Sequence, residues 1–313
     1  MNIKQYEHRP VLLNEVLQGL NIRTDGCYFD CTFGRGGHCR SILERLDEKG
    51  HLFAIDKDPD AIRSVSDDLS SDKRFRLIQG SFTMLSKIVE KNNLQHGIHG
   101  ILFDLGVSSP QLDNPERGFS FRQDSYLDMR MDNSAGLTAA EWIMTADEPE
   151  IARVLSQYGE ERFSKKIARA IVTTRSMQKI STTRQLADLI TATIPFREKN
   201  KHPATRTFQA IRIFINRELE ELGQALNQTI DILAEGGRLV VISFHSLEDR
   251  IVKRFMRNQS RGDIYPLEIP VPELLNKPKL KVIGKAIYPD QNEINCNARA
   301  RSAVLRIAER LPV

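Results

Sequence analysis

The sequence contains no apolar run that approaches the ~20 residues needed to cross a bilayer. Its first ten residues, MNIKQYEHRP, also lack the apolar segment of a signal peptide. The absence of both argues against a membrane protein and makes the cytoplasm the expected compartment. With 313 residues, of which 40% are hydrophobic and 27% charged, the composition is that of a globular protein with one large domain or two modest ones.

Cysteine is scarce, and the four cysteines form no metal-binding pattern. Cys27, Cys31 and Cys39 lie close together, and Cys296 lies near the end of the sequence. Their spacing matches no C-x-x-C zinc pattern, and free thiols are the ordinary state in a cytoplasmic protein. We therefore expect no metal site.

Neither sign of charge dominates, because 45 Lys and Arg residues against 41 Asp and Glu residues give a formal net charge of +4. The placement of the charges is more informative than this balance. A basic stripe that includes aromatic residues would suit an RNA or DNA backbone, although one such stripe alone is as consistent with a solvated helix face. Two stripes are present, Arg162, Phe163, Lys165, Lys166, Arg169 and Arg175 in the first, and Arg250, Lys253, Arg254, Phe255 and Arg257 in the second.

Residues 28–39, YFDCTFGRGGHC, form the most informative segment. A short apolar strand leads into a turn built from Gly34, Gly36 and Gly37, and a helix is expected to begin at about His38. Such a turn lets backbone N–H groups approach a ligand closely at the positive end of a helix, where a side chain would obstruct them. The segment therefore predicts a nucleotide-like cofactor, while an ordinary strand-to-helix turn is the alternative.

Apolar strands and amphipathic helices alternate on either side of a long interruption. The period is that of βαβ units, which predicts an α/β fold with a doubly wound, mostly parallel sheet. After the interruption we expect a long helix at about 205–233 and a strand at 238–244. Two further strands, at 279–286 and 303–308, are close enough in sequence to pair antiparallel at the sheet edge. The earlier strands are expected at 51–56, 75–78 and 100–104.

The interruption, from about residue 112 to 201, shows helix start signals and no convincing strand. Thr138 and Glu141 have capping-box spacing, and Asp147 is placed to open another helix. This predicts an all-helical subdomain inserted in the sheet's connections. The expected domains are residues 1–111 with 203–313 for the sheet, and 112–202 for the inserted subdomain.

Asp56 lies about twenty residues after the glycine turn, at the end of the second expected strand. A carboxylate at this place can accept hydrogen bonds from both hydroxyls of a ribose. Glycine turn and carboxylate together predict an adenosine-type cofactor. The turn lacks the third glycine of the dinucleotide fingerprint, because Cys39 stands there, and Asp30 could meet an ammonium group. This favours S-adenosylmethionine, and NAD stays open.

Residues 104–113, D-L-G-V-S-S-P-Q-L-D, begin at the carboxyl end of the fourth expected strand. They resemble the Asp/Asn/Ser-Pro-Pro-aromatic loop of enzymes that methylate exocyclic amines on nucleobases. Such an amine is a poor nucleophile, because its lone pair is delocalised into the ring. Groups that accept its N–H protons favour the more nucleophilic form, and Asp104, Ser108, Ser109 and the carbonyls before Pro110 are candidates. An aspartate before a proline turn, without function, is the alternative.

His245 follows the strand expected at 238–244 and is a candidate for proton transfer or substrate contact. The alternative is structural, with Ser246 as helix N-cap and Asp249 three residues later. The sequence alone does not decide between them.

Seven segments together resemble one known family, the bacterial small-subunit rRNA cytosine-N4 methyltransferases of the MraW type. The resemblance covers nearly the whole chain. It rests on D-x-T-x-G-x-G-G-H, D-L-G-V-S-S-P-Q-L-D, R-G-F-S-F-R, D-M-R-M-D, Y-G-E-E-R-F, H-P-A-T-R-T-F-Q-A-I-R-I and S-F-H-S-L-E-D-R-I-V-K.

The resemblance implies transfer of a methyl group from S-adenosylmethionine to the N4 amine of a cytidine in the decoding region of 16S rRNA. It implies a class I methyltransferase fold, Rossmann-like, with a helical substrate-recognition insert. The partner would be 16S rRNA, within the small ribosomal subunit, and a homodimer is compatible with the sequence. A nicotinamide-dependent oxidoreductase and a non-catalytic rRNA-binding factor are the alternative functions.

The glycine turn makes Gly34 a candidate for cofactor binding. The resemblance implies further cofactor contacts, which by position fall on Gly36, Gly37, His38, Asp56, Phe82, Asp104 and Gln111. The sequence departs from the family pattern at Cys39, where Ser is usual, and at Ala298, where Pro is usual. Neither departure puts the implied activity in doubt.

Overall fold

The computed structural model describes residues 10–94, 97–195, 202–261 and 277–312. The chain forms two compact units, which we call the sheet unit (Met1–Gly106 with Leu219–Val313) and the helical unit (Val107–Glu218). The helical unit starts earlier and ends later than the insert expected at 112–202, of which residues 196–201 lie outside the described part.

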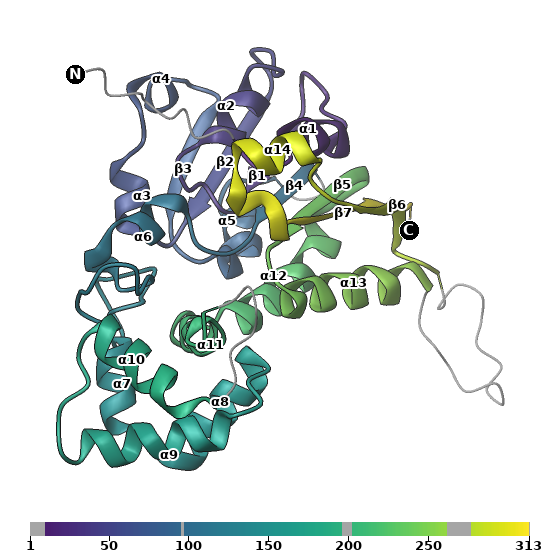
Figure 1. The fold of residues 1–313 in the computed structure, drawn as a ribbon. Helices are drawn as coiled ribbons and strands as arrows, with labels where there is room; N and C mark the ends of the chain where they lie inside the picture. Colours follow the sequence, from purple (N-terminus) through teal and green to yellow (C-terminus); the bar gives the residue numbers. More distant parts are fainter. Residues whose placement is uncertain (1–9, 95–96, 196–201, 262–276, 313) are drawn as a thin grey trace, which may run out of the picture. The chain divides into compact units, whose positions relative to one another are not determined.

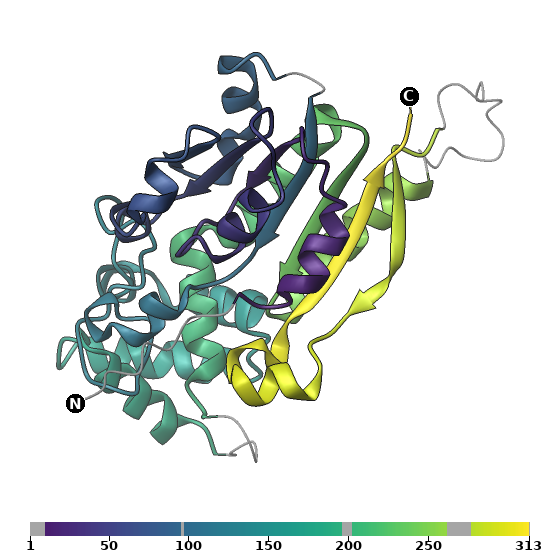
Figure 2. The ribbon, with the colours of Figure 1, turned by 90° about the horizontal axis from the view of Figure 1, so that it is seen from above.

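The described residues of the sheet unit form a seven-stranded sheet in the order β3-β2-β1-β4-β5-β7-β6 (Figures 1 and 2). β1 to β5 run parallel, and β7 pairs antiparallel with both β5 and β6. This confirms the predicted doubly wound sheet of a class I methyltransferase and its antiparallel edge. The strands are β1 (Cys27–Asp30), β2 (His51–Asp56), β3 (Phe75–Gln79), β4 (Ile98–Asp104), β5 (Leu233–Ser243), β6 (Leu280–Ile287) and β7 (Val304–Arg310).

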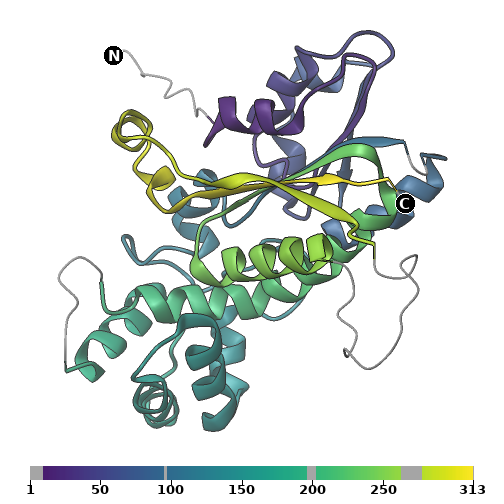
Figure 3. The same cartoon turned by 90° about the vertical axis from the view of Figure 1, so that its right-hand side faces the viewer.

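Helices cover both faces of this sheet. One face carries α5 (Leu85–Lys91), α12 (Glu218–Ile232) and α13 (Ser246–Arg261), of which α12 and α13 are seen in Figure 3. The other face carries α1 (Leu13–Leu20) and α2 (Gly37–Leu43). The short helices of this unit are α3 (Pro59–Arg63), α4 (Asp67–Ser70), η1 (Phe82–Met84), α14 (Gln291–Cys296) and η4 (Ala298–Ser302).

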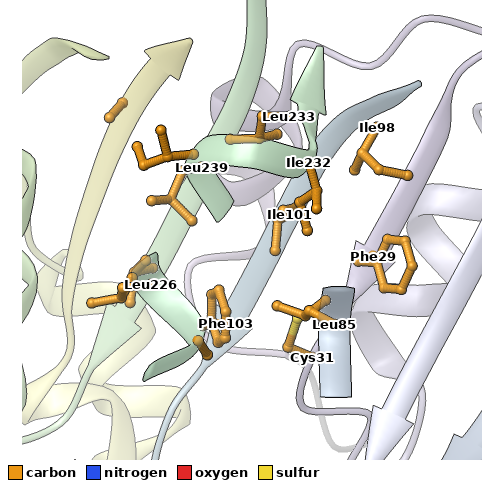
Figure 4. Packing of buried hydrophobic residues seen from close by; sticks show 14 of the residues in the cluster. Phe29, Cys31, Leu85, Ile98, Ile101, Phe103, Leu226, Ile232, Leu233 and Leu239 are labelled. Atoms are coloured by element: carbon orange, nitrogen blue, oxygen red, sulfur yellow. The ribbon is translucent and has the colours of Figure 1, made fainter. Parts of the chain in front are cut away.

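The central strands are buried on both faces, which explains their nearly continuous apolar sequences. On the first face, Phe29 and Phe103 of the sheet pack with Leu85 of α5 and Leu226 of α12 (Figure 4). On the other face, Tyr28 of β1 is fully buried beneath α1 and α2. The sheet is therefore fixed between two apolar layers, while β1, β2 and β4 each end at an aspartate at their carboxyl ends.

The helical unit has its own core, in which Trp142, Ile171, Leu186 and Phe208 are buried. Within its described residues an isolated bridge between Tyr126 and Thr182 is the only strand-like pairing outside named strands. The predicted start signals are confirmed, as a capping box at Thr138 and an N-cap at Asp147. The helices are α6 (Ser109–Asp113), η2 (Pro115–Arg117), α7 (Ala139–Thr145), α8 (Glu148–Gly159), α9 (Ser164–Arg175), α10 (Thr183–Thr193) and α11 (Thr205–Asn216).

The single long helix predicted at 205–233 is wrong, because the chain breaks at Arg217 between α11 and α12. Arg217 has left-handed backbone, with φ 53°. Asn216 explains the break: its side chain donates to the Met129 carbonyl at 2.8 Å and accepts from the Met131 N–H at 2.6 Å. These bonds hold the end of α11 in place.

No helix among the described residues is long and apolar enough to span a membrane.

Gly100 in β4 provides a test of how tightly the sheet is packed. A Cβ added there would lie 2.7 Å from the Tyr28 ring and 2.9 Å from Leu20. The ring cannot move away easily, because the Tyr28 hydroxyl accepts a hydrogen bond from the Arg23 N–H at 2.7 Å. We expect Gly100→Ala to lower the free energy of unfolding by about 1–3 kcal/mol in urea titrations.

Gly223 is the matched control, since a Cβ there meets no atom within 4 Å. It lies inside α12, so Gly223→Ala should raise the free energy of unfolding by about 0.5–1 kcal/mol. Equal effects of the two substitutions would contradict the packing argument.

Candidate active site at the carboxyl ends of the strands

The strand order reverses at β1, whose neighbours are β2 and β4. In open α/β sheets ligands bind outside the carboxyl ends of the strands at such a switch point. Asp30 ends β1 and Asp104 ends β4, and Thr32 links the two ends. The Thr32 hydroxyl accepts from the Asp104 N–H at 2.7 Å, while the Thr32 N–H donates to the Asp30 carboxylate at 3.1 Å. Thr32 thereby fixes the Asp30 carboxylate and the Asp104 backbone at the carboxyl ends of these two strands.

The glycine turn after β1 is confirmed, but its N–H groups are used differently from the expectation. Gly34 and Gly36 have positive φ angles, 55° and 73°, which glycine adopts without strain. The Gly34 N–H donates to Asp56 Oδ2 at 2.8 Å, and the Gly36 N–H donates to the Phe33 carbonyl at 2.8 Å. Both N–H groups are therefore engaged within the protein.

Packing explains two of the three glycines. A Cβ on Gly36 would lie 2.7 Å from Leu69 and 2.8 Å from the Phe33 ring, and a Cβ on Gly37 would lie 2.5 Å from Pro10. At Gly34, by contrast, the nearest atom would be the Thr32 carbonyl oxygen at 3.9 Å. Only Gly34 leaves open space beside the turn.

Asp56 ends β2 and has both carboxylate oxygens in hydrogen bonds. Oδ2 accepts from Gly34, and Oδ1 accepts from the Asp58 N–H at 2.9 Å. Burial raises the pKa of Asp56 to about 6, although the two N–H donors act in the opposite direction. Each carboxylate oxygen retains a lone pair, so the group can still accept hydrogen bonds from a ligand.

His38 lies between the two strand-end carboxylates. Its side chain is 5% exposed, and its Nε2 lies 3.6 Å from Oδ2 of Asp104, whose side chain is 25% exposed. Asp30 is only 1% exposed and accepts a hydrogen bond from the Cys39 thiol at 3.1 Å. Burial raises the pKa of Asp30, and the nearby His38 and the Cys39 thiol partly offset this. The sequence suggested that Asp30 could meet a ligand's ammonium group, but Asp30 is too deeply buried for this contact. Asp104, by contrast, is accessible.

Several buried polar atoms at these strand ends have no hydrogen-bond partner. They are both ring nitrogens of His38, Oδ1 of Asp104 and, at the end of the neighbouring β5, Oγ of Ser243. Buried polar groups are normally satisfied, so unpaired ones mark a place where a ligand or water completes the structure. The residues present therefore fit a polar ligand at the carboxyl ends of β1, β4 and β5.

Phe82 begins η1, after the two residues that follow β3, and is partly buried. Its ring packs edge-on against Phe103, with 5.6 Å between the centroids. The residue is nevertheless partly exposed to solvent.

Glu221 of α12 is a site residue that sequence reasoning missed. Its carboxylate accepts from Lys57 Nζ at 2.7 and 2.9 Å and from the Ser81 hydroxyl at 2.8 Å. Lys57 follows Asp56 and Ser81 precedes Phe82, so one side chain holds the segments after β2 and β3 together. Glu221 lies 164 and 140 residues from its partners, and no local pattern indicates such a contact.

The helix after β5 starts differently from the structural alternative considered for Ser246 and Asp249. The Glu248 N–H donates to Nδ1 of His245 at 3.3 Å, and the Glu248 carboxylate accepts from the Phe244 and His245 N–H groups. Nε2 of His245 lies 3.1 Å from Oε1 of Glu248. His245 therefore caps α13 itself, and Asp249 instead binds Arg306.

Three predicted site residues belong to the helical unit. Ser108 is the N-cap of α6, and its side chain and that of Gln111 form a reciprocal capping box. Ser109 is the first residue of that helix. The Ser108 carbonyl accepts from the Leu112 N–H at 3.2 Å, so it already serves the helix. Gly34, Gly36, Gly37, His38, Asp56, Phe82, Asp104 and His245 lie in the sheet unit.

Comparison with solved structures finds chains of similar length. An inferred rRNA methylase from Clostridium thermocellum has 13% sequence identity, with 96% of this chain and 95% of that chain covered, at a TM-score of 0.44. An rRNA methylase from Streptococcus thermophilus has 12% identity, 96% and 94% coverage, and a TM-score of 0.42. An inferred methyltransferase from Streptococcus mutans, in complex with SAH, has 13% identity, 96% and 97% coverage, and a TM-score of 0.43.

Comparison with protein families gives a match to the MraW methylase family over residues 5–311. The match covers nearly the whole chain and includes every strand of the sheet. The chain belongs to the MraW methylase family, and it is an S-adenosylmethionine-dependent methyltransferase.

Proposed function

We propose that the protein methylates the N4 amine of a cytidine in the decoding region of 16S rRNA, within the small ribosomal subunit. The resemblance of its seven sequence segments to cytosine-N4 enzymes supports this substrate. The structural observation that carries the proposal is Asp104 at the switch point of the sheet, whose carboxylate is 25% exposed and whose buried Oδ1 has no hydrogen-bond partner.

The cofactor assignments follow the strand ends. Asp56 would accept hydrogen bonds from the ribose hydroxyls, and Phe82 would stack on the adenine. His38 and Asp104 would hold the amino-acid end, beside the open space at Gly34, with Gly36 and Gly37 shaping the turn. When bound, S-adenosylmethionine supplies an electrophilic methyl group on a positively charged sulfur. Gln111, assigned as a contact by the family pattern, also fixes the start of α6.

Asp104 would act on the amine. Its partly exposed carboxylate can accept a hydrogen bond from the exocyclic amine, which favours the nucleophilic form of the amine and stabilises the positive charge that grows on the nitrogen during methyl transfer. The carbonyl of Ser109 and the hydroxyls of Ser108 and Ser109 are further candidate acceptors. No covalent enzyme intermediate is needed, so the protein's contribution is alignment and electrostatics. His245, which caps α13, would act by fixing the end of β5.

Replacement of Asp104 tests the catalytic assignment. We expect Asp104→Ala to lower the methylation rate by about 100-fold or more, because the acceptor of the amine proton is lost. The measurement is incorporation of labelled methyl from S-adenosylmethionine into rRNA, at saturating cofactor. Asp67→Asn, which removes an exposed carboxylate from α4, should keep the wild-type methylation rate.

Near-normal turnover by Asp104→Ala would refute the catalytic role. Mass spectrometry of rRNA from cells with and without the protein identifies the nucleotide. The proposal fails if no cytidine loses a methyl group when the protein is absent.

The raised pKa of Asp56 predicts a pH dependence of cofactor binding. The folded-state pKa of about 6 exceeds the ordinary value of 3.8, so without cofactor the folded protein binds a proton at Asp56 below about pH 6. Protonated Asp56 contributes to the free energy of unfolding at low pH, and this contribution is lost as pH rises through 6. The ribose hydroxyls should favour the ionised carboxylate. S-adenosylmethionine affinity should therefore fall by up to about tenfold for each pH unit below 6.

Calorimetry from pH 5 to 8 measures this dependence. Asp56→Asn should bind more weakly at pH 8 and lose most of the dependence below pH 6. A variant with the wild-type affinity and pH profile would rule out the ribose assignment.

Glu221 provides a third test, of positioning rather than contact. We expect Glu221→Gln to raise the Kd for S-adenosylmethionine by about tenfold, because hydrogen bonds between charged groups contribute about 1.5–3 kcal/mol. The rate at saturating cofactor should change little. Glu220→Gln, at the exposed neighbouring position, is the control, and an equal effect there would contradict the argument.

A further inference from the structure

α13 is the most strongly amphipathic basic helix of the sheet unit. Its apolar side chains Leu247, Val252 and Met256 are buried, and Val252 and Met256 belong to the core of the sheet unit. The opposite side carries exposed basic residues, which we call the α13 basic face: Arg250, Lys253, Arg254, Arg257 and Arg261.

The spacing of these residues forms a continuous line. Arg250, Arg254, Arg257 and Arg261 follow one another at intervals of four, three and four, which places them on one side of the helix. With a rise of about 1.5 Å per residue, the line spans roughly 16 Å. A surface of this length can contact several consecutive phosphates of a nucleic acid strand.

Three carboxylates near α13, all in the described part of the chain, are engaged elsewhere. Glu248 is buried and accepts from backbone N–H groups at the helix start. Asp249 binds Arg306 at 2.6 and 3.0 Å, and Glu309 of β7 binds Arg238 at 2.7 Å. These carboxylates therefore do not neutralise the outer side of the helix.

The basic surface continues beyond the end of the helix. The Lys279 N–H donates to the Gln259 carbonyl of α13 at 2.8 Å, which fixes the start of β6 beside the helix end. Lys277 and Lys279 are both exposed at this place. Figure 3 shows α13 running along the sheet beside β6 and β7.

The first basic stripe, in the helical unit, is less suited to phosphate. Arg169 lies 3.5 Å from the Glu148 carboxylate, and the Arg175 guanidinium donates to the Ile143 carbonyl. The aromatic residue of each stripe, Phe163 or Phe255, packs against a core. The aromatic members are therefore largely engaged in packing, and phosphate contact is the better-supported role for the second stripe.

We propose that the α13 basic face, with Lys277 and Lys279, binds the phosphodiester backbone of the RNA substrate. This rests on the proposed action on rRNA, and it concerns backbone contacts that carry no sequence information. A membrane surface is the weaker alternative, because a helix that binds lipid inserts its apolar side, and that side of α13 is buried in the core.

The test compares two triple variants with equal loss of charge. One is R254Q/R257Q/R261Q, on the α13 basic face, and the other is R45Q/K49Q/K73Q, exposed positions elsewhere on the sheet unit. Binding to a 16S rRNA fragment is measured by fluorescence anisotropy at salt concentrations from about 50 to about 300 mM. Thermal melting and S-adenosylmethionine affinity show that both variants are folded.

We expect the first variant to bind the RNA at least about tenfold more weakly and its salt slope to fall by about 2, as three phosphate contacts require. The second variant should bind like wild type. Equal losses in both variants, or wild-type binding by the first, would overturn the proposal. So would binding to phosphatidylglycerol vesicles with no binding to the RNA.

The two proposals fail in different ways. If the wild-type protein leaves cytidine N4 unmethylated but RNA binding by the first variant is weaker and less salt-dependent, the substrate assignment fails. The proposal that the α13 basic face binds RNA is then still supported. If the wild-type protein methylates cytidine and the first variant binds and methylates equally well, only the surface is wrong.

Discussion

The hydrogen bond from the Gly34 N–H to the Asp56 carboxylate joins the turn after β1 to the end of β2. It requires a left-handed residue in the turn and a carboxylate at the strand end at the same time. The other oxygen of Asp56 receives the Asp58 N–H, where α3 begins. One carboxylate therefore fixes a turn, a strand end and a helix start. The raised pKa of Asp56 follows from its burial among these elements, and the proposed ribose contact depends on the same arrangement.

The order of strands and helices in the sheet unit was predictable, because apolar strands and helix start signals are local properties of the sequence. Even the antiparallel pairing of β6 with β7 followed from their short separation. The reason for each glycine was not predictable. Gly36 and Gly37 are needed because Leu69 and Pro10 pack against them, and these neighbours are known only once the chain has folded.

The same distinction explains the other differences. Glu221 meets Lys57 and Ser81 across more than a hundred residues, so nothing near it in sequence indicates its role. At the start of α13, serine at position 246 is the better N-cap by preference, yet the chain places His245 there. The buried Glu248 carboxylate accepts the preceding N–H groups, and this tertiary arrangement overrides the local preference.

Cys39 shows how a departure from the family pattern fits the site. Burial raises the pKa of the Cys39 thiol, so it keeps its proton and donates to Asp30. A thiol is a weaker donor than the serine hydroxyl usual there, so it stabilises the ionised form of Asp30 less. His38 lies next to this buried carboxylate, and its Nε2 lies 3.6 Å from Asp104. The weaker bond at Cys39 therefore leaves the ionised form of Asp30 more dependent on its other neighbours, His38 and the Thr32 N–H.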